Sequence, residues 1–403
     1  MKHFDVAILG AGPAGSSAAI QLAGKGYSVA LLDKEQFPRE KLCGDFLNPV
    51  NWPMLRELKV ARAVLARPYE KISIFRFTSF SGEEAEIPLP ADRDDAVVGL
   101  GLRRFDLDYV LLERARSLGV TVLDGWKPKE LERQPDGWIL KADKSDVFGE
   151  LGARMLIGAD GRNSWVAHHL GLADPAAMQG RSVGFQFRLK CTNRSTGKVE
   201  IHLFPGGYAG VVGLDGDTVT LGLAVEKHRL LDGRPEQSLL KYILPQNPWL
   251  KEMLRGARVI EVRSTYPVYF PPRRAYSDGV LLVGDAARVN EPVTGEGIYF
   301  ALKSGELAAG TMDQAFRKSD FSADQLRLYE RECRSVFRVR RGINALIRWL
   351  IYRPALLSPV IRLSHKRTRL LDPIVHMICA PQLLDNPSSL SPRRLCGNVI
   401  LRR

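Results

Sequence analysis

Short apolar runs and a helical pattern alternate at the start of the chain. Residues 4–9 (FDVAIL) are mostly apolar, residues 14–24 have the composition of a helix, and residues 27–32 form a second apolar run that ends at Asp33. Short apolar strands on either side of a helix are typical of a βαβ unit with parallel strands. The first part of the chain therefore predicts a Rossmann-like unit.

Two later apolar runs also end in an aspartate. Residues 154–159 precede Asp160 and residues 279–284 precede Asp285, and small residues and a helical pattern follow each aspartate. The carboxyl ends of parallel strands form the ligand crevice of an open α/β sheet. We therefore expect these two aspartates and Asp33 to converge on one ligand.

Between these landmarks the hydrophobic pattern changes its period. Residues 71–89 and 182–225 alternate apolar and polar positions, with glycine-rich turns between the runs. Such alternation is typical of antiparallel sheet. The sequence thus predicts an α/β fold in which a Rossmann-like domain carries an inserted antiparallel β-sheet domain.

The C-terminal region has a helical pattern. It runs from Ser322 to about Leu350, and breaks are predicted at Pro354 and Pro359 because proline removes a backbone donor. The tail from Pro381 is rich in proline and serine and is predicted to be loose.

A glycine motif lies between the first predicted strand and helix. It reads Gly10-Ala11-Gly12-Pro13-Ala14-Gly15, and Asp33 closes the next strand. Gly10 permits a tight turn, Gly12 lets the backbone approach a pyrophosphate, and Gly15 allows close helix–sheet packing. The helix N-terminus favours an anion, and Asp33 can accept hydrogen bonds from the adenosine ribose. The motif predicts a dinucleotide cofactor and does not by itself separate NAD from FAD.

Two further motifs point to FAD by resemblance. Residues 156–163 (LIGADGRN) and 280–300 (VLLVGDAARVNEPVTGEGIYF) resemble the FAD motifs of flavoproteins with the para-hydroxybenzoate hydroxylase type of fold. The resemblance implies that Asp285 contacts the ribityl chain and that residues 295–298 approach the flavin ring. It also implies that Asp160 supports the nucleotide site and the access of a reductant. As single residues, these aspartates are equally suited to cap helices.

Residues 104–115 (RFDLDYVLLERA) resemble a helix of the same superfamily whose arginine lies near the flavin phosphates or ring. Arg104 is the predicted contact, and Arg103 is the alternative.

The run at residues 37–45 (FPREKLCGD), with residues 295–310, resembles the geranylgeranyl reductase family, which reduces carbon–carbon double bonds in isoprenoid chains. In that family the cysteine of the K-x-C-G run lies beside the isoalloxazine, so Cys43 is predicted to be catalytic. An inert buried thiol is the alternative. From the motifs and resemblances together, the predicted FAD contacts are Gly10, Gly12, Ala14, Gly15, Asp33, Lys34, Cys43, Gly44, Asp45, Arg104, Asp160, Gly161, Gly284, Asp285, Gly295, Gly297 and Ile298.

The resemblance weakens in the inserted sheet. Members of the reductase family carry a Y-x-W-x-F-P run over the substrate cavity. This chain has Glu200 at the tyrosine position and His202 at the tryptophan position. It keeps Phe204 and Pro205, which are the predicted substrate contacts. His202 is a candidate proton donor because histidine titrates near neutral pH, although a lone strand histidine is more often structural. The run also departs from the W-x-W-x-I-P run of flavin halogenases.

The leading interpretation is an FAD-dependent oxidoreductase that reduces a carbon–carbon double bond of an apolar, isoprenoid-like or natural-product substrate. The alternatives are an FAD-dependent monooxygenase acting on an aromatic ring and flavin electron transfer to a quinone. Because no second GxGxxG motif occurs, NAD(P)H is expected as an external reductant at a surface groove. The predicted FAD-binding domain comprises residues 1–70, 100–180 and 268–322, the substrate domain residues 71–99 and 181–267, and the helical C-terminal region residues 323–403.

The composition limits the kinds of metal or disulfide site and the partners that the chain can have. The chain has 403 residues and only five cysteines, which are far apart, so disulfide scaffolds, zinc ribbons and cysteine-ligated iron–sulfur clusters lose support. We predict no metal site and reduced thiols in the cytoplasm. The net charge of +13 is concentrated between Glu332 and Asp372, where no acidic residue occurs. This segment is either a solvated helical face or a contact with an anionic membrane, and no nucleic-acid motif accompanies it.

Overall fold

A computed structural model describes residues 1–90, 99–145, 147–174, 180, 182–230, 235–288, 292–366 and 371–379. The predicted loose tail from Pro381 lies outside these residues.

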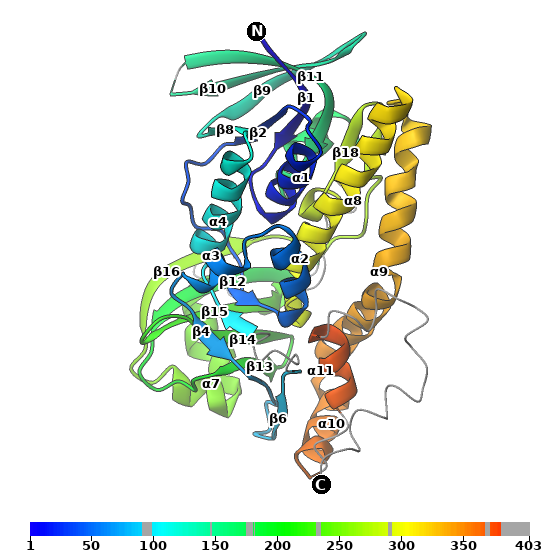
Figure 1. The fold of residues 1–403 in the computed structure, drawn as a ribbon. Helices are drawn as coiled ribbons and strands as arrows, with labels where there is room; N and C mark the ends of the chain where they lie inside the picture. Colours follow the sequence, from blue (N-terminus) through cyan, green and yellow to red (C-terminus); the bar gives the residue numbers. More distant parts are fainter. Residues whose placement is uncertain are drawn as a thin grey trace.

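A largely parallel sheet forms the first layer (Figure 1). Its strands are β1 (Lys2–Leu9), β2 (Val29–Asp33), β8 (Thr121–Asp124), β9 (Lys127–Gln134), β10 (Gly137–Lys144), β11 (Val147–Gly158), β17 (Tyr276–Ser277) and β18 (Val280–Leu282). The order β17-β18-β11-β1-β2-β8 brings together the three strands that precede the predicted aspartates. Strands β18, β11, β1, β2 and β8 run parallel, which confirms the predicted Rossmann-like unit.

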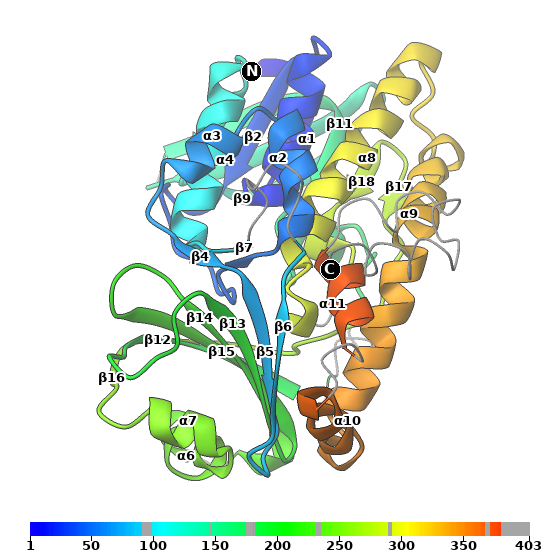
Figure 2. The ribbon, with the colours of Figure 1, turned by 60° about the horizontal axis from the view of Figure 1, so that its bottom comes forward.

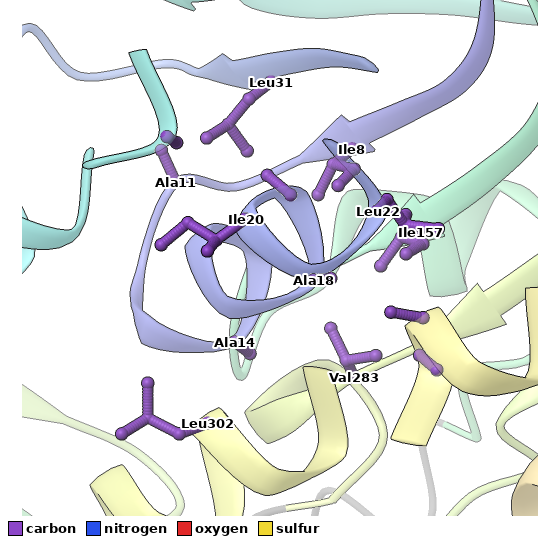
Figure 3. Close-up of a cluster of buried hydrophobic side chains, with 14 of the residues drawn as sticks. Ile8, Ala11, Ala14, Ala18, Ile20, Leu22, Leu31, Ile157, Val283 and Leu302 are labelled. Atoms are coloured by element: carbon purple, nitrogen blue, oxygen red, sulfur yellow. The ribbon is translucent and has the colours of Figure 1, made fainter. Parts of the chain in front are cut away.

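Two helices, α1 (Pro13–Gly24) and α8 (Gly297–Lys318), pack closely side by side. A Cβ built on Gly305 would lie 2.3 Å from the backbone oxygen of Ala14, so only glycine permits this approach. Figure 3 shows the apolar core between α1, the strands and α8, with Ile8, Ala18 and Leu302 among its members. Burial of this core fixes the start of α1 at the carboxyl end of β1.

A second sheet of seven strands has the order β16-β12-β15-β14-β13-β5-β6. Its strands are β5 (Ile74–Thr78), β6 (Glu84–Pro88), β12 (Ser182–Lys190), β13 (Lys198–Phe204), β14 (Gly207–Gly213), β15 (Thr218–Glu226) and β16 (Arg258–Thr265). All neighbours pair antiparallel except β13 with β5. The predicted α/β fold with an inserted, mainly antiparallel sheet is therefore confirmed.

Helices and a small sheet complete the structure. The small sheet contains β3 (Phe46–Leu47), β7 (Gly99–Gly101) and β4 (Glu70–Ile72). The other helices include α2 (Trp52–Glu57), α3 (Ala61–Leu65), α4 (Arg104–Ser117), α5 (Trp165–His169), α6 (Pro235–Ser238), α7 (Pro248–Met253), α9 (Ala323–Ile351), α10 (Pro354–Lys366) and α11 (Asp372–Cys379).

The two faces of the seven-stranded sheet have different cover. Val199, Ile201 and Leu203 belong to a cluster that includes residues of α9, α10 and α11, whereas Phe204 packs with residues of α7. Figure 2 shows α6 and α7 beneath the sheet and the C-terminal helices beside it. We call the face with Ile201 and Leu203 the inner face.

One predicted helix break is confirmed and one is wrong. Helix α9 ends at Ile351 and α10 begins at Pro354, where a proline costs no hydrogen bond. Helix α10 continues through Pro359. Its buried Ile361 packs in the inner-face cluster, and this packing offsets the donor that Pro359 removes.

Candidate functional site: a glycine loop ringed by cations

The three glycines of the first motif have different surroundings. Gly10 has φ +109°, and a Cβ there would lie 2.3 Å from the Ala159 backbone oxygen. A Cβ on Gly15 would lie 1.9 Å from the backbone oxygen of Gly10. Gly12 has an ordinary φ of −74°, and its nearest contacts would be guanidinium nitrogens of Arg39 and Arg104, at 3.7 and 3.8 Å. Gly10 and Gly15 are thus required by the fold, while Gly12 faces a space bordered by cations.

These cations are held by one buried carboxylate. Asp108 has no exposed surface, and it accepts hydrogen bonds from Arg39 Nη1 at 2.9 Å and from Arg104 Nε at 2.6 Å. Burial and the charges of Arg39 and Arg104 lower the pKa of nearby Lys41. Asp33 Oδ2 also lies 3.6 Å from Arg39 Nη2. Two internal carboxylates therefore accompany three cations, and the excess positive charge lies at the N-terminus of α1, where the helix dipole also favours anions.

Asp33 braces the glycine loop. Its Oδ2 accepts a hydrogen bond from the amide of Ala11 at 2.8 Å, and its Oδ1 accepts from the amide of Glu35 at 2.9 Å. The predicted contact of Asp33 with a ribose stays a prediction. Lys34, the neighbouring predicted contact, is exposed.

Asp160 caps a helix. Its Oδ1 accepts from the Ser164 hydroxyl at 2.6 Å and its Oδ2 from the Val166 amide at 3.0 Å, at the start of α5. Gly161 follows with φ +83°, and a Cβ there would lie 3.9 Å from Lys41 Nζ. This part of the motif therefore reaches the same cationic space through Gly161.

Asp285 lies on an exposed turn held against the start of α1. Gly284 has φ +57°, a Cβ there would lie 3.0 Å from the Ala14 Cβ, and its amide donates to the Ser304 hydroxyl at 2.9 Å. The turn thus presents the Asp285 carboxylate beside the glycine loop.

The Gly295-Glu296-Gly297-Ile298 turn begins α8. Gly295 has φ +65° and approaches the ring of Phe46, whereas a Cβ on Gly297 would meet nothing within 4 Å. Ile298 is buried. Glu296 is only 2% exposed and accepts hydrogen bonds from Arg340 at 2.6 Å and from Asn344 at 2.9 Å.

Cys43, Gly44 and Asp45 lie at the joint between the two sheets. Asp45 has φ +54° and is fully buried, and it accepts from the Thr220 hydroxyl at 2.7 Å. A Cβ built on Gly222 of β15 would lie 3.8 Å from the Gly44 Cα. The Cys43 run therefore connects the cationic space near Arg104 with the inner face of the seven-stranded sheet.

The half-buried Cys43 thiol has an electrostatic environment of its own. Burial raises the pKa of this thiol, and the charge of Arg104 acts in the opposite direction. The thiol is consequently protonated at neutral pH.

His202 is not brought to this group. It shares the outer face of β13 with Phe204, and its Nδ1 lies 2.7 Å from the Thr78 hydroxyl. Burial, and secondly the charge of Arg76, lower the pKa of His202 to about 3. The 3.7 Å separation from Glu200 is therefore not an ion pair at neutral pH. The predicted roles of His202, Phe204 and Pro205 gain no support from this placement.

Stability at acid pH tests the state of His202. Because its pKa is lower in the folded protein than in the unfolded chain, the stability it contributes is full above about pH 6.5 and is lost as the pH falls towards 3. We expect His202→Phe to flatten this acid limb in urea unfolding experiments. The exposed His228 provides the control His228→Gln, which should keep the wild-type slope. A wild-type slope in His202→Phe would show that His202 is charged in the fold.

The residues fit an FAD molecule. The open approach at Gly12, the cations Arg39, Lys41 and Arg104, and the carboxylate of Asp285 offer a pyrophosphate cradle and an acceptor for hydroxyl groups. The sequence analysis missed Arg39, Lys41 and Asp108. Their signal was present, because they stand within the two runs that carried the resemblances.

Comparisons with known proteins agree with this geometry. The family model described as "FAD binding domain" matches residues 3–211. An uncharacterized protein of Methanosarcina barkeri is 30% identical over 349 residues, covering 82% of this chain and 80% of that protein. A 1H-pyrrole-2-carbonyl-[peptidyl-carrier protein] chlorinase of Pseudomonas fluorescens is 27% identical over 81% of this chain and 79% of its own. Digeranylgeranylglycerophospholipid reductase 1 of Methanopyrus kandleri is 28% identical over 86% of this chain and 91% of its own.

Solved structures show the same fold. The flavin-dependent brominase Bmp2 superposes with a TM-score of 0.80 at 21% identity, covering 99% of this chain and 98% of that chain. A geranylgeranyl bacteriochlorophyll reductase-like protein from Thermoplasma acidophilum gives a TM-score of 0.72 at 21% identity, covering 99% and 96%.

Proposed function

This chain belongs to the FAD-binding domain family of flavin-dependent oxidoreductases, and on that premise we propose that it reduces a carbon–carbon double bond in an apolar substrate. FAD, when bound, supplies the redox chemistry. The observation that carries the proposal is the position of the Cys43 run, which joins the cationic cradle to the inner face of the sheet. The part of that face on β13 and β14 is apolar, with buried Ile201, Leu203 and Tyr208.

The residues of the chain have separate tasks in this proposal. Arg39, Lys41 and Arg104 bind and orient the cofactor through its phosphates. The apolar part of the inner face, on β13 and β14, excludes water and favours an apolar substrate. The Cys43 Sγ holds a proton at neutral pH, because burial raises its pKa, and can donate it to the reduced carbon.

Flavin-dependent halogenation is the second candidate. A chlorinase is among the relatives, and a brominase has the same fold. The run at residues 200–205 (EIHLFP) lacks the first two aromatic residues of both the halogenase run and the reductase run, but its Phe204-Pro205 ending matches the reductase run. A digeranylgeranylglycerophospholipid reductase covers a larger share of the chain than the chlorinase does.

Anaerobic turnover distinguishes these functions. FAD-loaded protein, reduced with dithionite without oxygen, should add two hydrogen atoms per double bond to geranylgeraniol or a geranylgeranylated lipid, detected by mass spectrometry. Turnover that needs oxygen would support a monooxygenase, and turnover that needs oxygen and halide would support a halogenase. Replacing dithionite with NADPH or NADH tests whether NAD(P)H is the external reductant, as we propose.

Cys43→Ala tests the proton donor. We expect this variant to keep FAD and thermal stability and to lose at least about tenfold in turnover, a barrier increase of about 1.4 kcal/mol. Cys191→Ala is the control, because the Cys191 thiol is buried on the outer side of the sheet. Equal turnover in the two variants would make Cys43 an inert thiol.

We also propose a peripheral contact with anionic membranes. Among the residues that the structure describes, no helix has the length and apolarity needed to cross a bilayer. Along α9 and α10, however, large apolar side chains are exposed, namely Leu346, Trp349, Leu356, Val360 and Leu363. Basic residues lie near them in a segment that contains no acidic residue. Each basic residue close to an anionic surface contributes about 1 kcal/mol to the free energy of membrane binding.

Sedimentation with vesicles tests this contact. The protein should pellet with vesicles that contain acidic lipid at low salt and be released at high salt. Trp349→Ser with Leu356→Ser should reduce the pelleted fraction. Full recovery in the supernatant under every condition would leave the segment as a solvated helical face.

A further inference from the structure

A cavity of about 540 Å³ lies behind the Asp285 turn. Helix α9, the first half of α8, residues 272–276 and the turn at residues 284–288 bound it. Helices α8 and α9 lie side by side in Figures 1 and 2. The cavity wall shares Gly284 and Asp285 with the cofactor cradle. Gly12, Arg104, Gly44 and Gly297 do not line it. The cavity is therefore a separate space with one wall in common with the FAD site.

The lining is rich in positive charge. Five of the lining residues are arginines and two are acids, Asp285 and Glu330. The arginines are Arg273, Arg274, Arg288, Arg334 and Arg341. Glu330 is engaged by Arg334 in an ion pair one helical turn apart, so it does not neutralise the other four.

Two of the arginines repel one another. Burial, and secondly the charge of Arg341, lower the pKa of Arg288 to about 10. Arg288 and Arg341 are both half-buried, and a bound anion would lower the repulsion between two neighbouring guanidinium groups. The cavity thus favours a ligand with at least one negative charge.

Part of the lining is apolar. Phe300, Tyr329 and Phe337 belong to it and are each less than 7% exposed, and the rings of Phe300 and Phe337 are 4.9 Å apart. Apolar atoms of a ligand would bury against these rings. The cavity therefore places guanidinium groups and aromatic rings side by side in one space.

We propose that this cavity binds a phosphorylated ligand with an apolar portion, whose phosphate lies between Arg288 and Arg341 and whose apolar part contacts Phe300 and Phe337. Guanidinium groups match phosphate oxygens in pairs, and two of them neutralise a dianion. The site is independent of the reaction proposed above, because it needs neither Cys43 nor the inner face of the sheet. Its phosphate could come from a soluble phosphorylated compound or from a lipid headgroup.

Calorimetric titration of the FAD-loaded protein tests the site. The probes are inorganic phosphate, hexyl phosphate, NADPH and short-chain phosphatidic acid. Hexyl phosphate should bind at least tenfold more tightly than inorganic phosphate. Arg288→Gln and Arg341→Gln should each weaken hexyl phosphate at least tenfold while flavin absorbance stays unchanged. Arg338→Gln, on α9 but outside the lining, should bind as the wild type does.

Further arms separate the ligand sources and the possible failures. Tighter binding of NADPH than of phosphatidic acid would identify a soluble phosphorylated compound, and the reverse order a lipid headgroup. Either outcome supports the site if Arg288→Gln weakens the binding of that probe, and NADPH binding that Arg288→Gln leaves unchanged belongs to a separate reductant site. Arg341→Lys keeps the positive charge without the planar guanidinium group. Its affinity for hexyl phosphate should therefore lie between those of the wild type and Arg341→Gln. The proposal is overturned if no probe binds, or if the glutamine variants bind as Arg338→Gln does.

Discussion

Gly12→Val should fold normally and lose its FAD. Gly12 has an ordinary φ of −74°, and a Cβ there meets only the ends of two arginine side chains, at 3.7 and 3.8 Å. The fold therefore accepts valine. The added methyl groups occupy the space in which a pyrophosphate must approach the backbone. We expect at least about a 100-fold loss of FAD affinity, about 2.8 kcal/mol, measured by flavin absorbance after gel filtration and by FAD titration of the apoprotein.

Two other glycines supply the comparison. Gly24→Val, at the other end of α1, should keep both fold and FAD, because nothing lies within 4 Å of a Cβ there. Gly15→Val should fail to fold, since its Cβ would lie 1.9 Å from the backbone oxygen of Gly10. A Gly12→Val protein with native circular dichroism and full FAD content would refute the cradle.

The sequence predicted the central strands of the α/β layer well because burial there is nearly complete. The second half of β1 and the whole of β2 are covered on both faces, so their apolar runs are continuous, and an aspartate marks the end of β2. What each aspartate contacts was beyond the sequence. Both carboxylate oxygens of Asp160 accept hydrogen bonds at the start of α5, from the Ser164 hydroxyl and the Val166 amide. These bonds depend on how the loop after Asp160 folds, which the sequence does not indicate.

The inserted sheet shows a different limit. Alternation indicates that Glu200, His202 and Phe204 share one face of a strand, because side chains repeat every second residue. It cannot indicate which face meets the cofactor domain. That is decided by Asp45, whose buried carboxylate accepts a hydrogen bond from Thr220 on the inner face. The resemblance therefore correctly assigned residues 200–204 to a strand. Glu200 and His202, however, lie on the face of that strand that points away from the cofactor domain.

The Glu296–Arg340 pair could not be predicted, because 43 residues separate the two positions and a buried ion pair leaves no periodic signal. Arg340 stood among the basic residues of the C-terminal segment and was expected on a solvated or membrane-facing surface. It is 1% exposed and crosses to the turn that begins α8. A charge run in sequence can thus contain a core residue.

Arg340→Met should destabilise the protein by about 3 to 5 kcal/mol, the usual cost of leaving one partner of a buried pair without its counterion. Arg340 also donates to the backbone oxygens of Met377 and Ile378, so its loss should loosen α11 as well. Arg338→Met, an exposed arginine of the same helix, should change the free energy of unfolding little. Urea unfolding measures all three proteins.

The pH dependence of this loss identifies its cause. Burial already raises the pKa of Glu296 in the wild type, and removing Arg340, whose charge opposes that rise, should raise it further. A carboxyl group with a raised folded-state pKa contributes stability at acid pH that is lost as the pH rises through that pKa. The deficit of Arg340→Met should therefore be small at acid pH and full at neutral pH. Adding Glu296→Gln should recover much of the loss at neutral pH, because no buried charge then remains. A deficit that is independent of pH and not recovered by Glu296→Gln would mean that Arg340 acts through packing and its bonds to α11 rather than through Glu296.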